Sequence, residues 1–553
     1  MFSQQKLTYY ANYIPDPYIR QNTFLKEEPQ LDPLPSFERS RALLPQPSWK
    51  GHDSAMDCYW KVWEIAFRNL RQPTRKNGFA SPYIDTAFNG NLFMWDSAFI
   101  LLFARYGKRA FNFQRTLDNF YAKQHPDGFI CREIRESDGT DTFTRFDPSA
   151  TGPNVMPWTE WEYYLNYGDQ ERLAKVFPPL LAFHHWFRRY RTWPDGTYWA
   201  SGWACGMDNQ PRLLIPEEDQ AVRYPLEWWG NGHMAWIDTC LQAVFSAQIL
   251  TKMAKALSRE PEVNNLQKEV QQLKGVINRT MWDEATGFYY DRFANGELSN
   301  VKTIGAYWAL LADILPPGNL ERFIAHLENS REFNRPHRVP SLSADHPDYS
   351  PEGSYWLGSV WAPTNYMILR GLTQAGLDGL AYEIGFNHLQ NVVSVFEQTG
   401  TVWENYAPEI AASQNTARNN PGEWTDLPPE MVRELERIRK IRENCKPGRP
   451  TPGNIARDDF VGWTGLPPVA VLFEYVFGLR PDVPANRLVW DIHLIDEHGI
   501  KGYPYGENGL LDLHCQARSS TWEQPVVSLL SNVPVVVEMR WEGGVETRQI
   551  PAS

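Results

Sequence analysis

The chain has 553 residues, of which 42% are hydrophobic and 22% are charged, and these proportions are ordinary for a folded protein with more than one structural unit. The formal net charge of −12 and the lack of a run of Lys and Arg argue against nucleic acid as a partner. The longest apolar run, around residues 98–103, is too short to cross a bilayer, so no membrane partner is expected.

The amino terminus and the cysteines indicate a compartment. The opening residues MFSQQKLTYY lack the basic start and apolar block of a signal peptide. Six cysteines are scattered along the chain without a CxxC pair, which is typical of reduced thiols. We therefore expect a cytoplasmic protein, although a chain whose signal had been removed would look the same. The oligomeric state is left open.

In chain order, residues 1–50 come first, and they are rich in Pro and Tyr without a sustained period. They are predicted to form an extended arm on the main body. From about residue 54 to 480, apolar residues recur at i, i+3, i+4 and i+7, which predicts at least eleven helices. The predicted segments are 56–70, 95–107, 111–124, 158–168, 171–191, 233–257, 262–282, 320–329, 363–376, 380–400 and 464–479.

No strand pattern alternates with these helices, so a βαβ architecture is not expected. Consecutive helices joined by loops of Gly, Pro, Asp and Trp favour a mainly α fold over residues 51–482, in which paired helices form a toroid, an (α/α)6 barrel. A solenoid of helical hairpins is the alternative, but it would need a fixed repeat with a consensus, which we do not find. Residues 483–553 cluster β-branched residues between turns and predict a small C-terminal β-domain.

Residues 409–458 interrupt the helical pattern as an insertion. They contain Asn-Asn-Pro-Gly, one charged helix and Pro-Gly-Arg-Pro-Thr-Pro-Gly. The basic residues at 433–442 alternate with glutamates, which indicates a solvated helix face with i,i+4 pairs. The insertion either covers a pocket as a lid or is a surface excursion.

Two short motifs each place one carboxylate among Trp, Asn and Gly. Asp208 lies in SGWACGMDNQPR at 201–212, and Glu404 lies in TVWENYAP at 401–408. The chain also has 23 tryptophans, whose flat faces either stack on sugars or fill a large core. Two carboxylates in different surroundings can act as acid and base on a glycosidic bond. Taken alone, Asp208 could equally cap a helix, and Glu404 could pair with a buried arginine.

Five motifs in one order resemble glycoside hydrolase family 63, which includes mannosylglycerate and glucosylglycerate hydrolases. GMDNQPR is similar to the family's GMDNSPR-like segment, and WENY matches the segment of its second carboxylate. FMWDSAF at 93–99, YWLGSVWAPTNY at 355–366 and FVGWTGL at 460–466 agree as well. The resemblance spans about residues 93–466, and the family 37 trehalases are more distant relatives.

The resemblance implies an (α/α)6 barrel with a pocket at one end, and an exo-acting α-glycosidase that inverts a small α-glucoside or α-mannoside. Asp208 would be the general acid and Glu404 the general base that activates water. Their carboxyl groups are then expected roughly 6.5–9.5 Å apart. The substrate-binding residues implied by the motifs are Trp95, Asp96, Asn209, Arg212, Trp361, Asn365 and Trp403.

Each of these residues has an expected role. Asp96 would bind sugar hydroxyls bidentately, and Trp95 and Trp361 would form stacking walls. Asn209 would donate to a hydroxyl. Arg212 would either contact a substrate hydroxyl or hold Asp208, whereas Asn365 and Trp403 could simply shape their loops.

The sequence also departs from the family. Gln210 replaces a serine, so its contact is uncertain, and the amino-terminal arm is too short for the large β-sandwich of bigger members. The chain is therefore more similar to the compact mannosylglycerate hydrolases, with a β-domain added.

Other chemistry has less support in the sequence. His184 and His185 lie mid-helix, and one of them is expected to pack, as is Cys205. No HExxH or EF-hand motif occurs, so we expect no cofactor, and the sequence neither requires nor excludes a structural calcium. A phosphorylase, epimerase or lyase on the same fold, or a non-catalytic carbohydrate-binding protein, remain alternatives. The sugar, linkage and aglycone are not specified.

Overall fold

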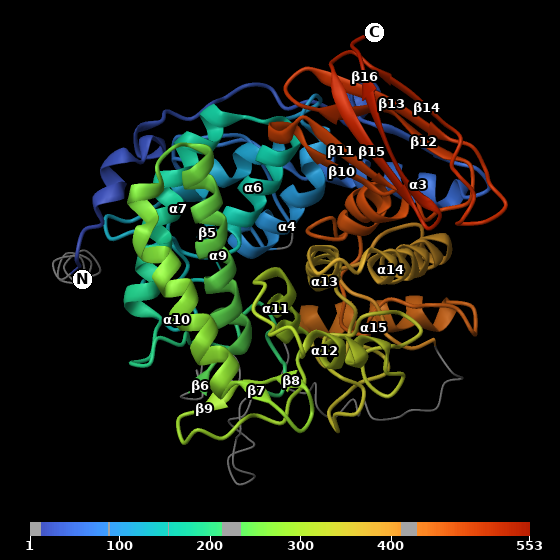
Figure 1. Cartoon of the computed structure of the whole chain (residues 1–553). Helices are drawn as coiled ribbons and strands as arrows, with labels where there is room; N and C mark the ends of the chain where they lie inside the picture. Colours follow the sequence, from blue (N-terminus) through green and yellow to red (C-terminus); the bar gives the residue numbers. More distant parts are fainter. Residues whose placement is uncertain (1–12, 87–88, 153, 213–233, 411–428) are drawn as a thin grey trace.

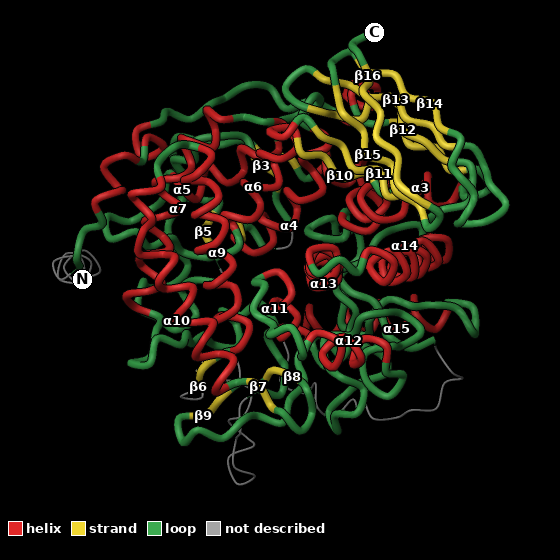
Figure 2. Tube along the Cα trace, in the orientation of Figure 1, coloured by secondary structure: helices red, strands yellow, loops and turns green. Residues whose placement is uncertain are grey.

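The computed structural model describes residues 13–86, 89–152, 154–212, 234–410 and 429–553. Over these residues the chain is mainly helical, and its longer strands gather at the carboxyl-terminal end (Figures 1 and 2). The described helices include none that is long and apolar enough to cross a membrane.

The helices agree with the apolar periodicity in most places. They are α2 Phe37–Ser40, α3 Asp53–Arg68, α4 Met94–Ala104, α5 Asp118–Tyr121, α6 Met156–Tyr167, α7 Gln170–Tyr190, α9 Ile237–Ala256, α10 Asn264–Thr280, α11 Trp308–Leu311, α12 Leu320–Glu328, α13 Ala362–Gln374, α14 Asp378–Thr399 and α15 Pro429–Asn444. Two predictions need correction. The segment 111–124 forms a 3-10 turn, Phe113–Leu117, followed by the short α5, and the segment 464–479 is a π-helix, Leu466–Val476.

Six helical elements form a closed ring of contacts, in which each element packs against the next and the last packs against the first. α4 lies against α6, α6 against α9, α9 against α11, α11 against α13, α13 against the π-helix, and the π-helix against α4. All residues of α4 and of the π-helix are buried, as expected for helices that are surrounded by others. By contrast, α10 packs on α9 and buries one stripe, so it is covered on one side only.

Two four-stranded sheets lie at the carboxyl-terminal end, with orders β1-β12-β13-β14 and β10-β11-β15-β16. Their strands are β1 Gln46–Trp49, β10 Leu479–Asp482, β11 Arg487–Asp491, β12 His498–Tyr505, β13 Gly509–Cys515, β14 Val527–Ser531, β15 Val535–Trp541 and β16 Gly544–Ile550. The pairing is antiparallel except between β11 and β15.

The amino-terminal arm takes part in this sheet region, which the sequence did not predict. β1 pairs with β12, so that Gln46 is opposite Lys501 and Trp49 is opposite His498. Four residues that include a proline are too few to show a strand period. The arm is therefore tied to the other end of the chain rather than simply laid along the helices.

Short two-stranded ladders also join the helices, contrary to the expectation that no strands alternate with them. They pair β2 Leu70–Arg71 with β3 Tyr83–Ile84, β4 Asn91–Phe93 with β5 Glu133–Arg135, β6 Met234–Ala235 with β9 Arg292–Phe293, and β7 Trp282–Asp283 with β8 Phe288–Tyr289. Pieces of two or three residues are too short to show alternation. Among them, β4 carries Phe93 and β5 directly follows Arg132, and both residues belong to the site described below.

Many of the tryptophans serve the core. One continuous buried cluster runs through the helices and into the sheets. The described tryptophans with less than 2% exposure are Trp63, Trp158, Trp186, Trp236, Trp308, Trp356, Trp361, Trp403 and Trp490. Packing thus accounts for a large share of the described tryptophans, although Trp356 also lines the site described below.

Candidate active site

One cavity of about 90 Å3 brings the two predicted carboxylates together, and we call it the carboxylate pocket. Its lining residues are Phe93, Trp95, Asp96, Arg132, Gly152, Trp203, Ala204, Gly206, Asp208, Tyr355, Trp356, Glu404 and Trp463. Asp208 and Glu404 are separated by almost two hundred residues of sequence, and every one of the five family-like motifs contributes to the wall.

Asp96 is positioned by the start of α4 and by a short ladder. It lies in the first turn of that helix, where the backbone N–H groups favour a negative charge. Phe93 pairs with Glu133 across β4 and β5, and the Met94 N–H donates to the Arg132 carbonyl at 2.8 Å. The ladder therefore sets the Arg132 segment beside the helix start.

Asp208 lies in a loop that its neighbours fix on both sides. The Cys205 N–H donates to the Ser201 carbonyl at 2.9 Å. Gln210, the departure from the family motif, donates to the Ser341 carbonyl and accepts from the Thr303 hydroxyl, both at 2.6 Å. Gln210 is thus an anchor of the loop and does not line the pocket.

Gly206 has a specific steric role in the same loop. Its φ of +76° is a left-handed conformation that glycine adopts readily. A Cβ at this position would lie 3.0 Å from the Trp95 indole. Trp95 and the Asp208 loop can therefore pack closely against each other.

Glu404 follows the end of α14 in a loop segment, at a bend of the chain. Its N–H donates to the Arg457 carbonyl at 2.8 Å, and its Oε2 accepts from the Arg457 N–H at 3.2 Å. Its own carbonyl accepts from Trp463 Nε1 at 2.8 Å. The Glu404 backbone is thus held between residues that come from two later segments.

The end of the 409–458 insertion belongs to this frame. Isolated bridges join Trp403 to Asp458 and Tyr406 to Pro452. Residues 452–458 are therefore neither a lid nor a surface excursion, because they pair directly with the Glu404 motif. Residues 411–428, which are also part of the predicted insertion, lie outside the described residues.

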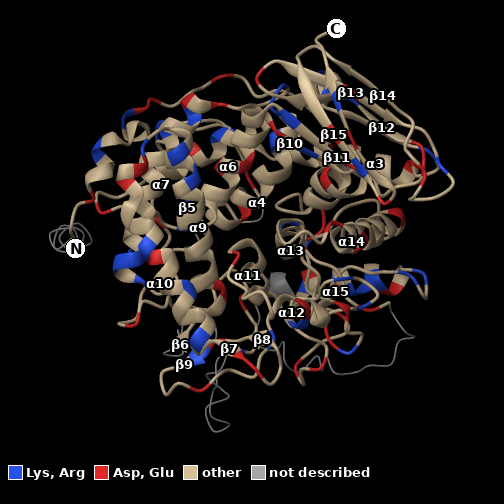
Figure 3. Cartoon of the chain, viewed as in Figure 1, with Lys and Arg blue, Asp and Glu red and all other residues tan. Residues whose placement is uncertain are grey.

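The charged helix of the insertion, α15, is amphipathic rather than fully solvated. Leu435 and Ile438 are buried, while basic and acidic positions alternate along its length (Figure 3). Arg437 pairs with Asp458 at 2.6 Å, and Arg442 with Glu352 at 3.2 Å. α15 therefore braces the segments beside the pocket without lining it.

Burial changes the acid–base properties of all three carboxylates. Burial raises the pKa of Asp208 to about 6, although Arg132 and Tyr355 act in the opposite direction. It raises the pKa of Glu404 to about 7; Arg457 opposes this rise and Asp208 adds to it. Burial also raises the pKa of Asp96, and the Glu404 charge contributes to that shift.

The stacking wall differs from the prediction. Trp356 lines the pocket, and Trp361 lies behind it with stacked rings, 4.0 Å between centroids and 3° between planes. Trp403 is fully buried and donates from Nε1 to the Thr399 hydroxyl at 3.0 Å. Trp361 and Trp403 thus support the site, whereas Trp95 lies in the pocket as expected.

The predicted asparagines are structural. Asn209 donates to the Ser354 carbonyl at 3.2 Å and accepts from the Trp356 N–H at 2.8 Å. Asn365 donates to the carbonyls of Val339 and Trp361 and accepts from the Val339 N–H. Their amide groups are committed to backbone, so the prediction that Asn209 donates to a substrate hydroxyl is not supported.

Arg212 does not face the pocket either. Its guanidinium bonds to both oxygens of Asp238 and of Asp291, at 2.6–2.9 Å, and it lies 4.3 Å from the centre of the Trp236 ring. The arginine is 1% exposed. Its role is to neutralise the charges of two buried carboxylates. These carboxylates lie too far from Arg212 in the sequence to be recognised there as its partners.

His184 and Cys205 pack as predicted. His184 is buried and contacts Glu269 at 3.1 Å, whereas His185 is half-buried and contacts Asp16 at 2.9 Å. Cys205 is buried, and burial raises the pKa of its thiol. Among the residues that the structure describes, no group of three or more His, Cys, Asp or Glu side chains could hold a metal ion.

The sequence missed several pocket residues. Trp203, Tyr355, Trp356 and Trp463 all lie within the quoted motifs, but the motifs do not say which aromatic faces the cavity. No sequence feature singled out Arg132, because it is one basic residue in a segment where basic and acidic residues alternate. It is the only Lys, Arg or His among the described lining residues.

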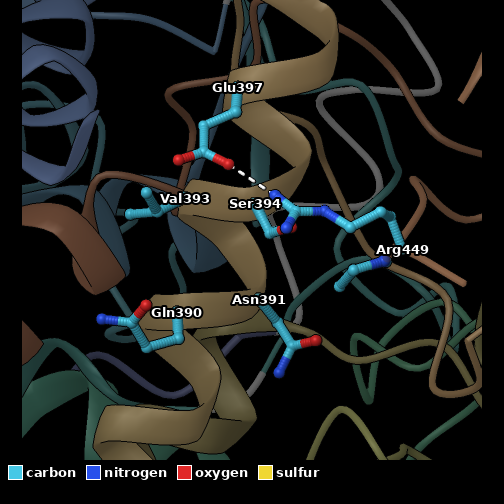
Figure 4. Close-up of a pocket in the computed structure, with 7 residues that line it drawn as sticks. Gln390, Asn391, Val393, Ser394, Glu397 and Arg449 are labelled. Atoms are coloured by element: carbon cyan, nitrogen blue, oxygen red, sulfur yellow. Dashed lines mark hydrogen bonds and ion pairs between the residues drawn. The ribbon is translucent and has the colours of Figure 1, made fainter. Parts of the chain in front are cut away.

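A second cavity, of about 330 Å3, lies along α14 and has different chemistry (Figure 4). Its one carboxylate, Glu397, pairs with Arg449 at 2.5 Å, and both side chains are more than a third exposed. Its described lining includes no aromatic residue. A single neutralised carboxylate does not provide an acid/base pair, so this cavity is not the candidate active site.

Replacing Arg212 tests its structural role. Arg212→Met leaves Asp238 and Asp291 buried without a counter-charge, so we expect a loss of about 3–5 kcal/mol in the free energy of unfolding, measured with urea. Lys50→Met is the control, because the exposed pair of Lys50 with Glu497 is screened by solvent and its loss should change the free energy of unfolding very little. An Arg212→Met variant with unchanged stability and a raised KM would instead indicate substrate contact.

Comparison with known proteins agrees with the motifs. The model of the mannosylglycerate hydrolase MGH1-like glycoside hydrolase domain matches residues 90–420, more than half of the chain. A mannosylglycerate hydrolase of Thermus thermophilus is 24% identical over 349 residues, 52% of this chain and 83% of that protein.

Two further relatives are matched over a smaller share of their length. An uncharacterised protein of Borreliella burgdorferi is 26% identical over 316 residues, 56% of this chain and 62% of the relative. A probable mannosyl-oligosaccharide glucosidase of Schizosaccharomyces pombe is 24% identical over 46% of this chain and 34% of the relative. The matched region is thus less than two thirds of each of these two proteins.

Solved structures show similarity of fold. A crystal structure of a family 63 mannosylglycerate hydrolase of Thermus thermophilus in complex with glucose has a TM-score of 0.53 and 19% identity, over 75% of this chain and 99% of that chain. A family 78 rhamnosidase of a Bacillus species has a TM-score of 0.57 and 12% identity, over 90% and 42%. With the match over residues 90–420, the chain belongs to the mannosylglycerate hydrolase MGH1-like glycoside hydrolases and is a glycosidase of the family 63 type.

Proposed function

We propose that this glycosidase is exo-acting and inverts the configuration of a small α-glucoside or α-mannoside, with Asp208 as general acid and Glu404 as general base. The supporting observation is that two carboxylates with raised pKa values, the buried Glu404 and the half-buried Asp208, line one aromatic cavity. Carboxyl groups with pKa values near neutrality can both hold and release a proton at working pH.

In the proposed reaction, Asp208 gives its proton to the leaving glycosidic oxygen as the bond to the anomeric carbon breaks. Glu404 takes a proton from the water that attacks the opposite face of the same carbon. In each turnover Asp208 gives one proton to the leaving group and Glu404 takes one proton from water. The proton count is balanced, so the proposed chemistry needs no cofactor.

The other lining residues would orient the sugar. Asp96 supplies a third carboxylate that can accept hydrogen bonds from hydroxyl groups, and Trp356 offers a ring that is held in place by the stacked Trp361. Trp95 Nε1 is buried and has no hydrogen-bond partner among the described residues, so the Trp95 ring contributes to the wall chiefly by its apolar surface. The small volume of the cavity favours the terminal residue of a glycoside.

We also propose that the closed set of six helical contacts is the inner layer of an (α/α)6 barrel. In support, α3, α7, α10 and α14 pack against that set, as a second layer would. We further propose a cytoplasmic location, since all six cysteines are unpaired, as expected in a reducing compartment.

The catalytic roles are tested by substitution and by the product. Asp208→Asn and Glu404→Gln should each lower kcat by about 10²–10⁴-fold while leaving binding of a non-hydrolysed glycoside nearly unchanged. NMR of the first product of an α-glycoside should show the β-anomer.

Three outcomes favour other functions. The α-anomer as first product would exclude inversion. Turnover that requires inorganic phosphate, or that gives an isomerised or unsaturated sugar, would favour a phosphorylase, epimerase or lyase. Two fully active variants would contradict the assignment of the site.

The pH dependence of kcat/KM should be bell-shaped. Below about 6 both carboxyl groups are protonated and no base remains, and above about 7 both are ionised and no acid remains. We therefore expect the maximum between these two values in a pH series at constant ionic strength. A maximum near pH 4, where ordinary carboxyl groups titrate, would contradict the effect of burial.

Arg132 suggests a test of the aglycone. Its side chain lines the pocket and is 15% exposed, and its charge acts on both Asp208 and Asp96. If it binds an acidic aglycone, glyceric acid glycosides should be preferred over the matching glycerol glycosides. Arg132→Leu should then reduce the ratio of the two kcat/KM values by about 10- to 100-fold, the loss of one charged hydrogen bond.

This comparison carries its own control. Any effect of Arg132 on the acid/base pair acts equally on both substrates and cancels in the ratio. Glucosyl and mannosyl versions of each pair identify the sugar in the same assay. An unchanged ratio would mean that Arg132 does not contact the aglycone.

A further inference from the structure

The placement of Glu404 depends on the backbone of Arg457. Asp208 and Glu404 both lie on loops, and a loop holds a catalytic group less precisely than a helix does unless neighbouring bonds fix it. The Arg457 carbonyl accepts from the Glu404 N–H at 2.8 Å, and the Arg457 N–H donates to Glu404 Oε2 at 3.2 Å. A shift of the Arg457 backbone would therefore move the carboxylate.

The residue after Arg457 is tied to helix α15. Asp458 accepts two hydrogen bonds from the Arg437 guanidinium, from Nη1 to Oδ2 at 2.8 Å and from Nη2 to Oδ1 at 2.6 Å. Glu434, three residues earlier on the helix, accepts from Nε and Nη2 of the same guanidinium at 3.0 and 2.6 Å and so orients it. An arginine–carboxylate pair with two bonds has a defined geometry. Helix α15 thus sets the position of the chain that holds Glu404.

Helix α15 also reaches the loop that supports the acid. Arg442 donates from Nη1 to Glu352 Oε2 at 3.2 Å. Two residues further along that loop, the Ser354 carbonyl accepts from Asn209 Nδ2 at 3.2 Å. Asn209 directly follows Asp208, so this bond joins the turn of the acid to the loop that Arg442 contacts. The same helix is therefore bonded to the supports of both catalytic carboxylates.

The helix itself is anchored in the body of the protein. Leu435 is 5% exposed and Ile438 is 2% exposed, so the side of α15 that carries them is packed into the interior. The family model matches residues 90–420 and therefore describes neither α15 nor the segment of Asp458. The bonds from α15 to the two supports are thus a feature of this chain beyond the matched region.

We propose that α15 sets the working separation of the general acid and the general base, with Arg437 and Arg442 as positioning residues. The inference rests on the proposed roles of Asp208 and Glu404. Neither arginine lines the carboxylate pocket, so each acts through the segment that it contacts. An inverting reaction needs roughly 6.5–9.5 Å between the carboxyl groups to admit the water. A displacement of about 1 Å can lower the rate by about 10²-fold, and the two ion pairs are placed to prevent it.

Loss of these ion pairs should change the rate rather than the stability. Pairs that water reaches contribute little to the free energy of unfolding, and the Arg437 and Asp458 side chains are 41% and 34% exposed. For Arg437→Met and Arg442→Met we expect kcat to fall by about 10-fold each, and by about 10²-fold in the double variant, with the urea midpoint of unfolding nearly unchanged. Arg439→Met is the matched control, because Arg439 pairs with Glu443 of the same helix, and it should alter neither quantity.

A mutant cycle tests whether Arg437 acts through Asp458. If both residues act through one contact, the double variant Arg437→Met/Asp458→Asn should be no slower than the slower of the two single variants. Arg437→Lys keeps the positive charge but loses the two-bond geometry, so it should recover part of the lost kcat. Losses that add in the double variant would contradict this route.

The leaving group separates the acid side from the base side. A dinitrophenolate ion departs without a proton, so hydrolysis of a dinitrophenyl α-glycoside does not require the general acid, whereas hydrolysis of the matching methyl α-glycoside does. Arg442→Met, which loosens the support of Asp208, should slow the methyl glycoside more than the dinitrophenyl glycoside. Arg437→Met, which loosens the support of Glu404, should slow both by the same factor. Equal slowing of the two substrates by Arg442→Met would contradict its link to the acid.

The outcomes distinguish this inference from the proposed function. Wild-type kcat in Arg437→Met and Arg442→Met, together with strongly slowed Asp208→Asn and Glu404→Gln variants, would contradict the positioning role and leave the catalytic assignment in place. A fall in kcat that is matched by a fall in the urea midpoint would mean that α15 only stabilises the fold, which also contradicts it. Full activity of Asp208→Asn and Glu404→Gln would contradict the proposed function, and the positioning role would fall with it.

Discussion

The removal of three carboxylates from water is the constraint on which the site depends. Asp96, Asp208 and Glu404 lie in one cavity walled by indole rings, and burial is the largest influence on the pKa of each. For Glu404, a rise from 4.5 to about 7 corresponds to about 3 kcal/mol of destabilisation of the ionised form. The rest of the fold has to supply that energy and hold the groups in place.

The fold keeps two of the three pocket carboxylates off the helices that carry the core. α4 and the π-helix are buried along their whole length, so their packing contributes stability, and of the three carboxylates only Asp96 lies on one of them, at the first turn of α4. Asp208 and Glu404 lie instead on loop segments, at a turn and at a bend. Hydrogen bonds between the Arg457 backbone and Glu404, and between the Gln210 side chain and the Ser341 carbonyl, fix these segments.

The sequence predicted what depends on local pattern and failed where distant partners decide. Apolar periodicity located α7 and α14, and ordered motifs located Asp208 and Glu404 in one site. The strand β1 was not predicted because its partner, β12, lies about 450 residues away in the sequence. Arg212 was misassigned for the same reason, since nothing near it in sequence shows that Asp238 and Asp291 surround it.

The tryptophans show a second limit of what a sequence motif can predict. The motif at 355–366 contains Trp356 and Trp361, and both suit a sugar-stacking wall by residue type. Only the stacking of one ring behind the other decides that Trp356 meets the cavity and Trp361 supports it. A motif therefore identifies the wall of a site before it identifies which side chain forms the surface.

The pairs Asp208–Asn209 and Glu404–Asn405 share one arrangement. Each carboxylate lines the pocket from a turn or a bend of the chain, and the amide that follows it bonds to the backbone of the surrounding frame. Asn405 donates to the Ile455 carbonyl, and Asn209 bonds to the Ser354 carbonyl and to the Trp356 N–H. The amide next to each carboxylate is thus a poor candidate for substrate contact and a good one for holding the segment. The positions of the two carboxylates therefore depend on backbone partners that lie far from them in the sequence.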